Sequence, residues 1–345
     1  MQKRYVALLF LSISTLCLMI FLLTQKTEKI VTNSQAKAIN QPSHITPPVK
    51  PTNEIEEKVA TPSMMKNQIK LGVAVENYSN NDNALVDIER KLSYPISTIS
   101  IFIQFGNPYN NQLNIEKLTY AKSNNKKLLI AWEPWNPNEG NKQTIDYLKG
   151  INNGDFDLYI HNFARSIRDY TSPVTLRFGH EMNGDWYPWG KRPQEYINAY
   201  RRIHNIFNQE QVSNIQFMWS INASPLTNID SYYPGNDIVD QIGIDGFNFG
   251  TTQPTSTWAS FKQIFYPSYQ HIVSRYPKPI IISETASTEI GGDKAEWIKT
   301  MLEDLTLTFP KVEEIIWFNI LKEADWRIDS SEKSLNSFSN WINSL

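Results

Sequence analysis

Short runs of β-branched and aromatic residues alternate with longer amphipathic segments from residue 69 to the end of the chain. The segments carry apolar residues at helical spacing, such as Phe163 with Ile167 and Trp297 with Met301. Strands that alternate with helices are typical of a parallel sheet covered by helices. Eight of the runs are predicted strands, at residues 70–76, 96–105, 127–132, 174–179, 215–220, 241–247, 279–283 and 314–319.

Eight strand–helix units predict an α/β fold, the (β/α)8 TIM barrel. Barrels of this kind need about 250 residues, and residues 68–345 are sufficient for one such domain. The competing architecture is a doubly wound open sheet, which would carry a glycine-rich turn after an early strand. Gly72 stands alone in the first predicted strand. We therefore expect one barrel domain at residues 68–345.

The first 24 residues are predicted to be a transmembrane anchor or a signal segment. Residues 6–23 form an uncharged apolar run shortly after Lys3 and Arg4, and a spanning helix needs about 17–25 such residues. A cleaved signal peptide would have a shorter apolar region, of about 7–15 residues. We expect a membrane-anchored protein with its domain outside the cytoplasm, periplasmic or extracellular, or alternatively a secreted one.

Residues 25–67 are predicted to be a disordered linker. The segment contains several prolines and no Phe, Tyr or Trp, so it cannot bury enough apolar surface to fold. The net charge of the chain is only −2, which gives no reason to expect nucleic acid as a partner. The single cysteine, Cys17, lies in the apolar run and cannot form a disulfide within the chain. The oligomeric state is not readable from the sequence.

Two glutamates follow predicted strands at equivalent places, three strand–helix units apart. Glu181 comes after the strand at 174–179, and Glu284 after the strand at 279–283. Active residues of such barrels lie at the carboxyl ends of strands, so the two carboxylates can face each other across the barrel mouth. A facing pair suits glycoside hydrolysis, which needs one carboxylic acid and one carboxylate. From spacing alone, two structural carboxylates remain an equal alternative.

Other catalytic chemistries lack their residues. His180 and Glu181 would begin a zinc peptidase motif, but the motif needs a second histidine where Gly184 stands. A Gly-x-Ser-x-Gly nucleophile motif is also absent from the sequence. We expect neither a metal nor another cofactor.

Four stretches in register resemble glycoside hydrolase family 26, the clan A family of β-mannanases and lichenase-like endo-β-glycanases. They are RFGHEMNGDWYPWG (177–190), DGFNFG (245–250), IISETAST (281–288) and IIWFN (315–319) running into EADWRIDSS (323–331). The resemblance spans residues 69–345. It implies a retaining endo-acting hydrolase of β-1,4-mannan or of β-1,3-1,4/β-1,4-glucan, with a polysaccharide as its partner. In that scheme Glu181 is the acid/base and Glu284 the nucleophile.

The same resemblance implies further substrate-binding residues. Arg177 and His180 border the carboxylate pair, and Trp186 follows the acid. Trp317 matches an aromatic residue that lies under the reactive sugar, with core packing as the alternative. The family commonly has a tyrosine where this chain has Phe247, and losing such a hydrogen bond to a charged group costs about 1.5–3 kcal/mol.

The segment WEPW at 132–135 departs from the mannanase pattern and looks closer to members that act on β-glucans. We expect Trp132 and Trp135 to form walls of a sugar subsite. Glu133 between them suits either sugar hydroxyls or a structural ion pair. Two other functions stay open at this point: a non-catalytic carbohydrate-binding barrel, and an exopolysaccharide-processing accessory protein at the membrane.

Overall fold

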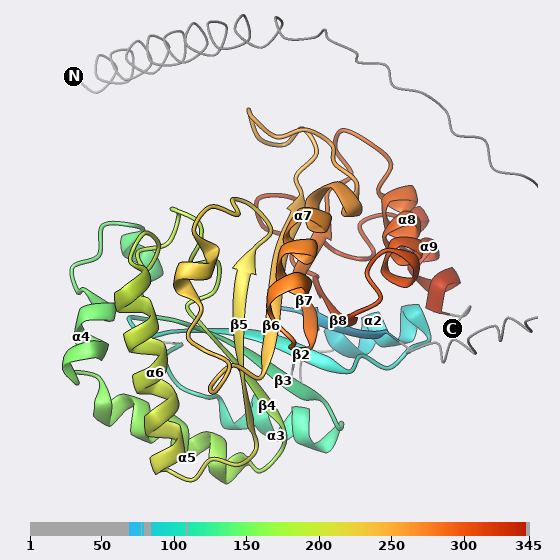
Figure 1. Cartoon of the computed structure of the whole chain (residues 1–345). Coiled ribbons are helices and arrows are strands. Elements are labelled where there is room, and N and C mark those ends of the chain that lie inside the picture. Colours follow the sequence, from blue (N-terminus) through green and yellow to red (C-terminus); the bar gives the residue numbers. More distant parts are fainter. Residues whose placement is uncertain (1–68, 77, 79–83, 108–109, 343–345) are drawn as a thin grey trace, which may run out of the picture. The chain divides into compact units, whose positions relative to one another are not determined.

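The computed structural model of the chain describes residues 69–76, 78, 84–107 and 110–342. Within these residues eight parallel strands close into a barrel in chain order, and helices cover its outside (Figure 1). The strands are β1 (Lys70–Ala74), β2 (Thr98–Gln104), β3 (Lys127–Glu133), β4 (Val174–Phe178), β5 (Ile215–Asn222), β6 (Gln241–Asn248), β7 (Ile280–Ser287) and β8 (Val312–Phe318). Because β1 pairs with both β2 and β8, the sheet has no open edge. The predicted TIM barrel is confirmed, and the open sheet is excluded.

Each of the eight strands overlaps a run predicted from the sequence. The helices are α2 (Ala84–Leu92), α3 (Ile115–Ser123), α4 (Tyr147–Asn153), α5 (Asp157–Tyr170), α6 (Pro193–Gln209), α7 (Phe261–Arg275), α8 (Lys294–Leu307) and α9 (Glu332–Ile342), with short 3-10 helices η2 (Pro137–Glu139) and η3 (Ile229–Tyr232). The expected apolar stripes are buried, including Phe163 and Ile167 on α5 and Trp297 and Met301 on α8.

Alternate residues of the strands face two different environments. One set packs against the surrounding helices in a large apolar cluster. The other set points into the barrel, where Leu129, Met218, Ile281 and Ile316 form a separate small cluster. Since successive side chains of a strand point to opposite faces, one position along a strand decides whether a residue lies in the barrel or under a helix.

Gly72 is required by the close approach of neighbouring strands. A Cβ atom there would lie 2.4 Å from Ile316 Cδ1 and 2.9 Å from the carbonyl oxygen of Thr98. The second contact is with backbone, which cannot rotate away. The lone glycine of the first strand therefore serves barrel packing.

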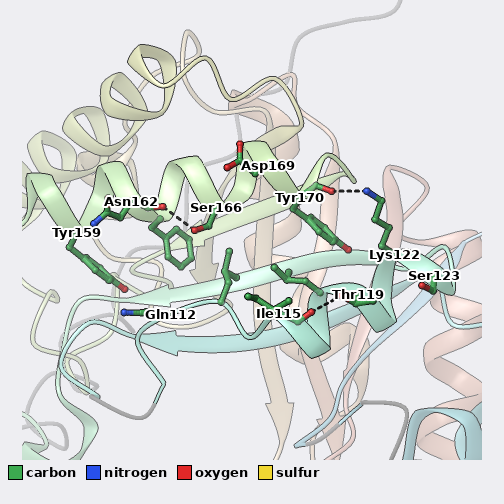
Figure 2. Close-up of a pocket in the computed structure, with 13 residues that line it drawn as sticks. Gln112, Ile115, Thr119, Lys122, Ser123, Tyr159, Asn162, Ser166, Asp169 and Tyr170 are labelled. Atoms are coloured by element: carbon green, nitrogen blue, oxygen red, sulfur yellow. Dashed lines mark hydrogen bonds between the residues drawn. The ribbon is translucent and has the colours of Figure 1, made fainter.

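A hollow of about 660 Å³ lies on the flank of the barrel between α3 and α5 (Figure 2). Its lining mixes apolar side chains such as Leu118 and Phe163 with polar ones such as Asn162 and Asp169. None of the site residues predicted from the sequence lines it. The candidate site lies instead at the carboxyl ends of the strands.

The predicted anchor at 1–24 and linker at 25–67 lie outside the described residues. In the part of the chain that is described, none of the helices has the length and apolar character needed to cross a membrane.

Gly72→Ala is expected to destabilise the barrel by about 1–3 kcal/mol, the usual cost of overpacking a filled core. The free energy of unfolding in urea measures the effect, and Ser123→Ala at the exposed end of α3 is the control. A Gly72→Ala protein as stable as wild type would show that β1, β2 and β8 can move apart at this point.

Candidate active site

A buried arginine joins two carboxylates at the mouth of the barrel. Arg177, on β4, donates from Nη1 to both oxygens of Asp245, at 2.9 and 2.8 Å, and from Nη2 to Glu284 Oε1. Asp245 also accepts from Ser220 Oγ at 3.0 Å and from Ser283 Oγ at 2.6 Å. The guanidinium and both carboxylates are buried, so each charge depends on this network for compensation.

Breaks in strand register bring these carboxylates together. The pairing of β6 with β7 shifts between Ile244 and Asp245, so that Asp245 stands opposite Glu284. The pairing of β7 with β8 shifts as well, between Ile282 and Thr285. Such irregularities turn a side chain away from strict alternation and are common beside active sites. They aim Glu284 into the mouth of the barrel.

Glu181 lies on the loop after β4, with a left-handed backbone φ of 54°. A non-glycine residue in this region is strained, and surrounding contacts must hold it there. Its amide donates to Ser220 O at 2.9 Å. Trp186 Nε1 donates to its Oε2 at 2.6 Å, and Asn222 Nδ2 donates to its Oε1 at 2.7 Å. Both carboxylate oxygens of Glu181 are therefore fixed in direction.

Asn222, at the end of β5, is itself held by a reciprocal pair of hydrogen bonds. The backbone amide of Asn222 donates to Asn183 Oδ1 at 2.8 Å, and Asn183 Nδ2 donates back to the backbone carbonyl oxygen of Asn222 at 2.8 Å. Asn183 also donates to Pro225 O at 2.6 Å. The loops after β4 and β5 thus form one unit around Glu181.

The two glutamates titrate differently because one of them has the arginine. Burial, together with the charges of Asp245 and Glu284, raises the pKa of Glu181 to about 8, against the hydrogen bonds from Asn222 and Trp186. Burial raises the pKa of Glu284 to about 7, with Arg177 opposing the rise. The geometry supports this order, since Arg177 hydrogen-bonds Glu284. Near neutral pH the site can hold an ionised Glu284 beside a protonated Glu181.

His180 and Glu133 form a second polar group beside the pair. His180 Nε2 lies 3.2 Å from Tyr187 Oη and 3.7 Å from Glu133 Oε1. Burial and the charge of Arg177 hold the pKa of His180 well below its usual value, so the ring is neutral. Glu133 Oε2 accepts from Gln104 at 2.8 Å and from Trp135 Nε1 at 3.1 Å. Its Oε1 has no such neutral donor and faces His180.

Aromatic rings form a continuous row from Trp326, on the segment between β8 and α9, to His180. Centroid separations are 5.4 Å for Trp326–Phe247, 5.6 Å for Phe247–Phe318, 6.1 Å for Phe318–Phe102 and 6.3 Å for Phe102–His180. Phe102 and Phe247 are only partly buried, so they offer apolar surface beside the polar groups. We call these five rings the aromatic row.

Most predicted site residues meet here. Arg177 binds Glu284, and Glu181 connects to the same network through Ser220, which accepts from the Glu181 backbone amide and donates to Asp245. His180 faces Glu133, Trp186 and Trp135 each donate to a glutamate, and Phe247 is in the aromatic row. Within the described residues no group of three or more His, Cys, Asp or Glu side chains could hold a metal ion.

Two predicted positions are wrong. Trp132 is fully buried on the outer face of β3, where it stacks on Phe163 of α5 at 4.3 Å, so it cannot form a wall of a subsite. Trp317 is also fully buried, with its ring against Phe338 of α9 at 4.8 Å. Strand alternation explains both errors, because the neighbouring residues Glu133 and Phe318 point into the barrel mouth.

Sequence reasoning missed the roles of Asp245, Asn222, Tyr187, Phe318 and Phe102. Four of them lie at or near the carboxyl end of a strand, and the fifth, Tyr187, lies within the quoted 177–190 stretch. Side chains of a strand alternate between the barrel interior and the helices. Phe318 is on the interior face, like Arg177, and Trp317 is on the outer face, so alternation along the strands would have selected Phe318. The partners of Asp245 depend on the register shift, which no local pattern signals.

Known proteins resemble the chain in sequence. A sequence profile described as glycosyl hydrolase family 26 matches residues 108–301. Endoglucanase H of Acetivibrio thermocellus is 40% identical over 227 residues, which cover 63% of this chain and 24% of that protein. Mannan endo-1,4-beta-mannosidase A and B of Caldalkalibacillus mannanilyticus is 32% identical over 85 residues, 22% of this chain and 16% of that protein. The chain thus spans about a quarter or less of the length of these relatives.

Solved structures share the fold. The catalytic domain of Bacillus sp. JAMB-750 GH26 endo-beta-1,4-mannanase superposes with a TM-score of 0.61 at 17% identity, covering 80% of this chain and 86% of that one. Bacillus subtilis mannanase BCman gives a TM-score of 0.58 at 18% identity, with 79% and 85% covered. At these identities the likeness is one of fold, whereas the profile match extends over more than half of the sequence. This chain belongs to glycoside hydrolase family 26.

Proposed function

We propose that the chain is a retaining, endo-acting hydrolase of a β-linked mannan or glucan, with Glu284 as nucleophile and Glu181 as acid/base. The observation that carries the assignment is the asymmetric contact of Arg177. It hydrogen-bonds Glu284, which favours the ionised form that a nucleophile needs. Glu181 has neutral donors from Asn222 and Trp186 instead, and keeps its proton to a higher pH.

In the first step a Glu284 oxygen attacks the anomeric carbon while Glu181 gives its proton to the leaving glycosidic oxygen. The C–O bond to the leaving sugar breaks, and a glycosyl ester forms on Glu284. The ester is neutral, so it no longer raises the pKa of Glu181. Glu181 then accepts a proton from water, which cleaves the ester and restores both side chains.

The surroundings suit a sugar ring. The neutral His180 and Oε1 of Glu133 can hydrogen-bond hydroxyl groups, while Phe102 and Phe247 present apolar faces to the ring C–H groups. Trp186, 39% exposed, borders Glu181 and can contact the leaving sugar. Phe247 brings no hydroxyl to Glu284, and Arg177 supplies the hydrogen bond on that side.

The substrate class follows from the relatives' names, which refer to endoglucanase and mannanase activities. The departures of the 132–135 segment favour β-glucan. A location outside the cytoplasm, tethered at the membrane, is part of the proposal and rests on the apolar run at 6–23. Incubation with a panel of purified mannans and glucans, with products analysed by mass, tests the class. A non-catalytic carbohydrate-binding barrel would release no reducing sugar from any of them.

Removing either glutamate is expected to abolish polysaccharide hydrolysis, but the two variants should differ on an activated substrate. Glu181→Ala should lose at least about 10²-fold on polymer yet still release dinitrophenol from an aryl β-glycoside, because that leaving group departs without a proton. Glu284→Ala should be inactive on both. Glu303→Ala, exposed on α8, is the control. Glu284→Ala with wild-type turnover would reject the mechanism.

Product stereochemistry tests double displacement independently. Proton NMR of the first products is expected to show the β-anomer, with the α-anomer appearing only through mutarotation. Initial formation of the α-anomer would mean direct attack by water, and Glu284 would then be a general base.

The alkaline limb of kcat/KM is expected near pH 8, where Glu181 loses its proton, and the acid limb near pH 7, where Glu284 gains one. The Trp186 hydrogen bond favours ionised Glu181 and so lowers its pKa. Trp186→Phe should therefore move the alkaline limb upward, by up to about one unit. Trp135→Phe is the control. It removes an indole N–H that donates to Glu133 instead of Glu181, so the alkaline limb should stay in place. A downward shift in Trp186→Phe would contradict the role of Glu181 as acid.

A further inference from the structure

Lys294 is a buried cation that the proposed mechanism does not use. It is the first residue of α8 and has no exposed surface. A cation in the first turn of a helix opposes the helix dipole, and burial of an ammonium group is costly unless hydrogen bonds compensate. The stability of α8 therefore does not explain why a lysine is buried at this position. The contacts of its side chain explain it.

The side-chain hydrogen bonds of Lys294 go to the segment between β8 and α9. Its Nζ donates to Asp325 O at 3.2 Å, to Arg327 O at 2.7 Å and to Ser330 Oγ at 2.8 Å. All three ammonium hydrogens thus have acceptors.

A second buried donor completes the arrangement. Trp317 Nε1 donates to Trp326 O at 2.6 Å, so the carbonyls of residues 325, 326 and 327 are each bound by Lys294 or Trp317. The ammonium group also lies 5.8 Å from the centre of the Trp317 ring. We call this pair of donors the carbonyl clamp.

The clamped segment carries one end of the aromatic row. The ring of Trp326 packs on Phe247 at 5.4 Å and on Phe249 at 5.1 Å. Phe247 continues through Phe318 and Phe102 to His180. Displacing Trp326 would remove one of the three aromatic neighbours of Phe247, the other two being Phe249 and Phe318.

We propose that Lys294 is a positioning residue for glycan binding: the carbonyl clamp holds Trp326 against Phe247, and the two partly exposed rings of the aromatic row, Phe247 and Phe102, are the platform for the sugar chain. The inference rests on the proposed function. It also gives Trp317 a role, since this residue acts on the site through its indole N–H.

Burial and the charged groups around the carbonyl clamp set the pKa of Lys294, and this pKa decides the pH at which the inference is tested. Burial lowers the pKa of Lys294 to about 8, while Glu289, Asp325 and Asp329 raise it and Arg327 lowers it. Below that pH the ammonium carries three hydrogens for its three acceptors. Kinetics are therefore measured at about pH 7, within the working range of the glutamate pair.

Lys294→Met, which keeps the length of the side chain and removes the donors, is expected to raise KM for the polysaccharide roughly 3- to 10-fold, equivalent to about one aromatic contact. kcat should stay within about 2-fold, because the platform binds ground state and transition state alike. Hydrogen exchange should accelerate in residues 321–331. Lys126→Met is the matched control: Lys126 is also buried, but it binds Glu89 and Ile96 O near the amino-terminal end of β3.

The inference is overturned if Lys294→Met and Lys126→Met lose similar stability and both retain the wild-type KM, because Lys294 is then only structural. If Lys294→Met does not fold, Trp326→Leu leaves the clamp donors in place and is expected to raise KM alone. An unchanged KM in that variant also overturns the inference. Failure of the proposed function would show differently, as an inactive wild-type protein.

Discussion

The site depends on one guanidinium group shared by two buried carboxylates. Arg177 neutralises one negative charge, but Asp245, Glu284 and Glu181 would together carry three. In a buried setting the excess charge is relieved most readily by a proton, and that proton resides on the carboxylate that has neutral donors. In the proposed mechanism, the difference between acid and nucleophile follows from where a single positive charge is hydrogen-bonded, because both groups are buried glutamates.

The barrel supplies the positions that make this charge pattern possible. Four different strand ends contribute Arg177, Asn222, Asp245 and Glu284, and closure of the sheet brings them together. Around them, an outer support of apolar and buried cationic groups fixes the aromatic surfaces, with Lys294 as its clearest member. In the proposed function the polar groups orient the reacting bond, whereas the aromatic row contributes uncharged surface. The two parts meet at His180.

Strand and helix positions were readable because the apolar periodicity of each segment is strong. All eight predicted strands were found, and the equivalent places of Glu181 and Glu284 after strands four and seven predicted a facing pair, whose charges interact in the structure. The errors at Trp132 and Trp317 have one cause: each is a single residue away from the position that faces the barrel mouth. Aromatic residues are favourable on both faces of a buried strand, so composition cannot indicate which face one occupies.

The sequence alone determined the fold class and the family motifs, and it predicted the two glutamates, because these depend on local periodicity and on residue types at strand ends. Tertiary structure decided which glutamate receives the arginine, where the register shifts, and which rings line the mouth. These features arise from contacts between residues far apart in the chain, such as Arg177 with Glu284, 107 positions away, and Phe102 with Phe318. Their energies come from burial and charge compensation, which exist only once the barrel has closed.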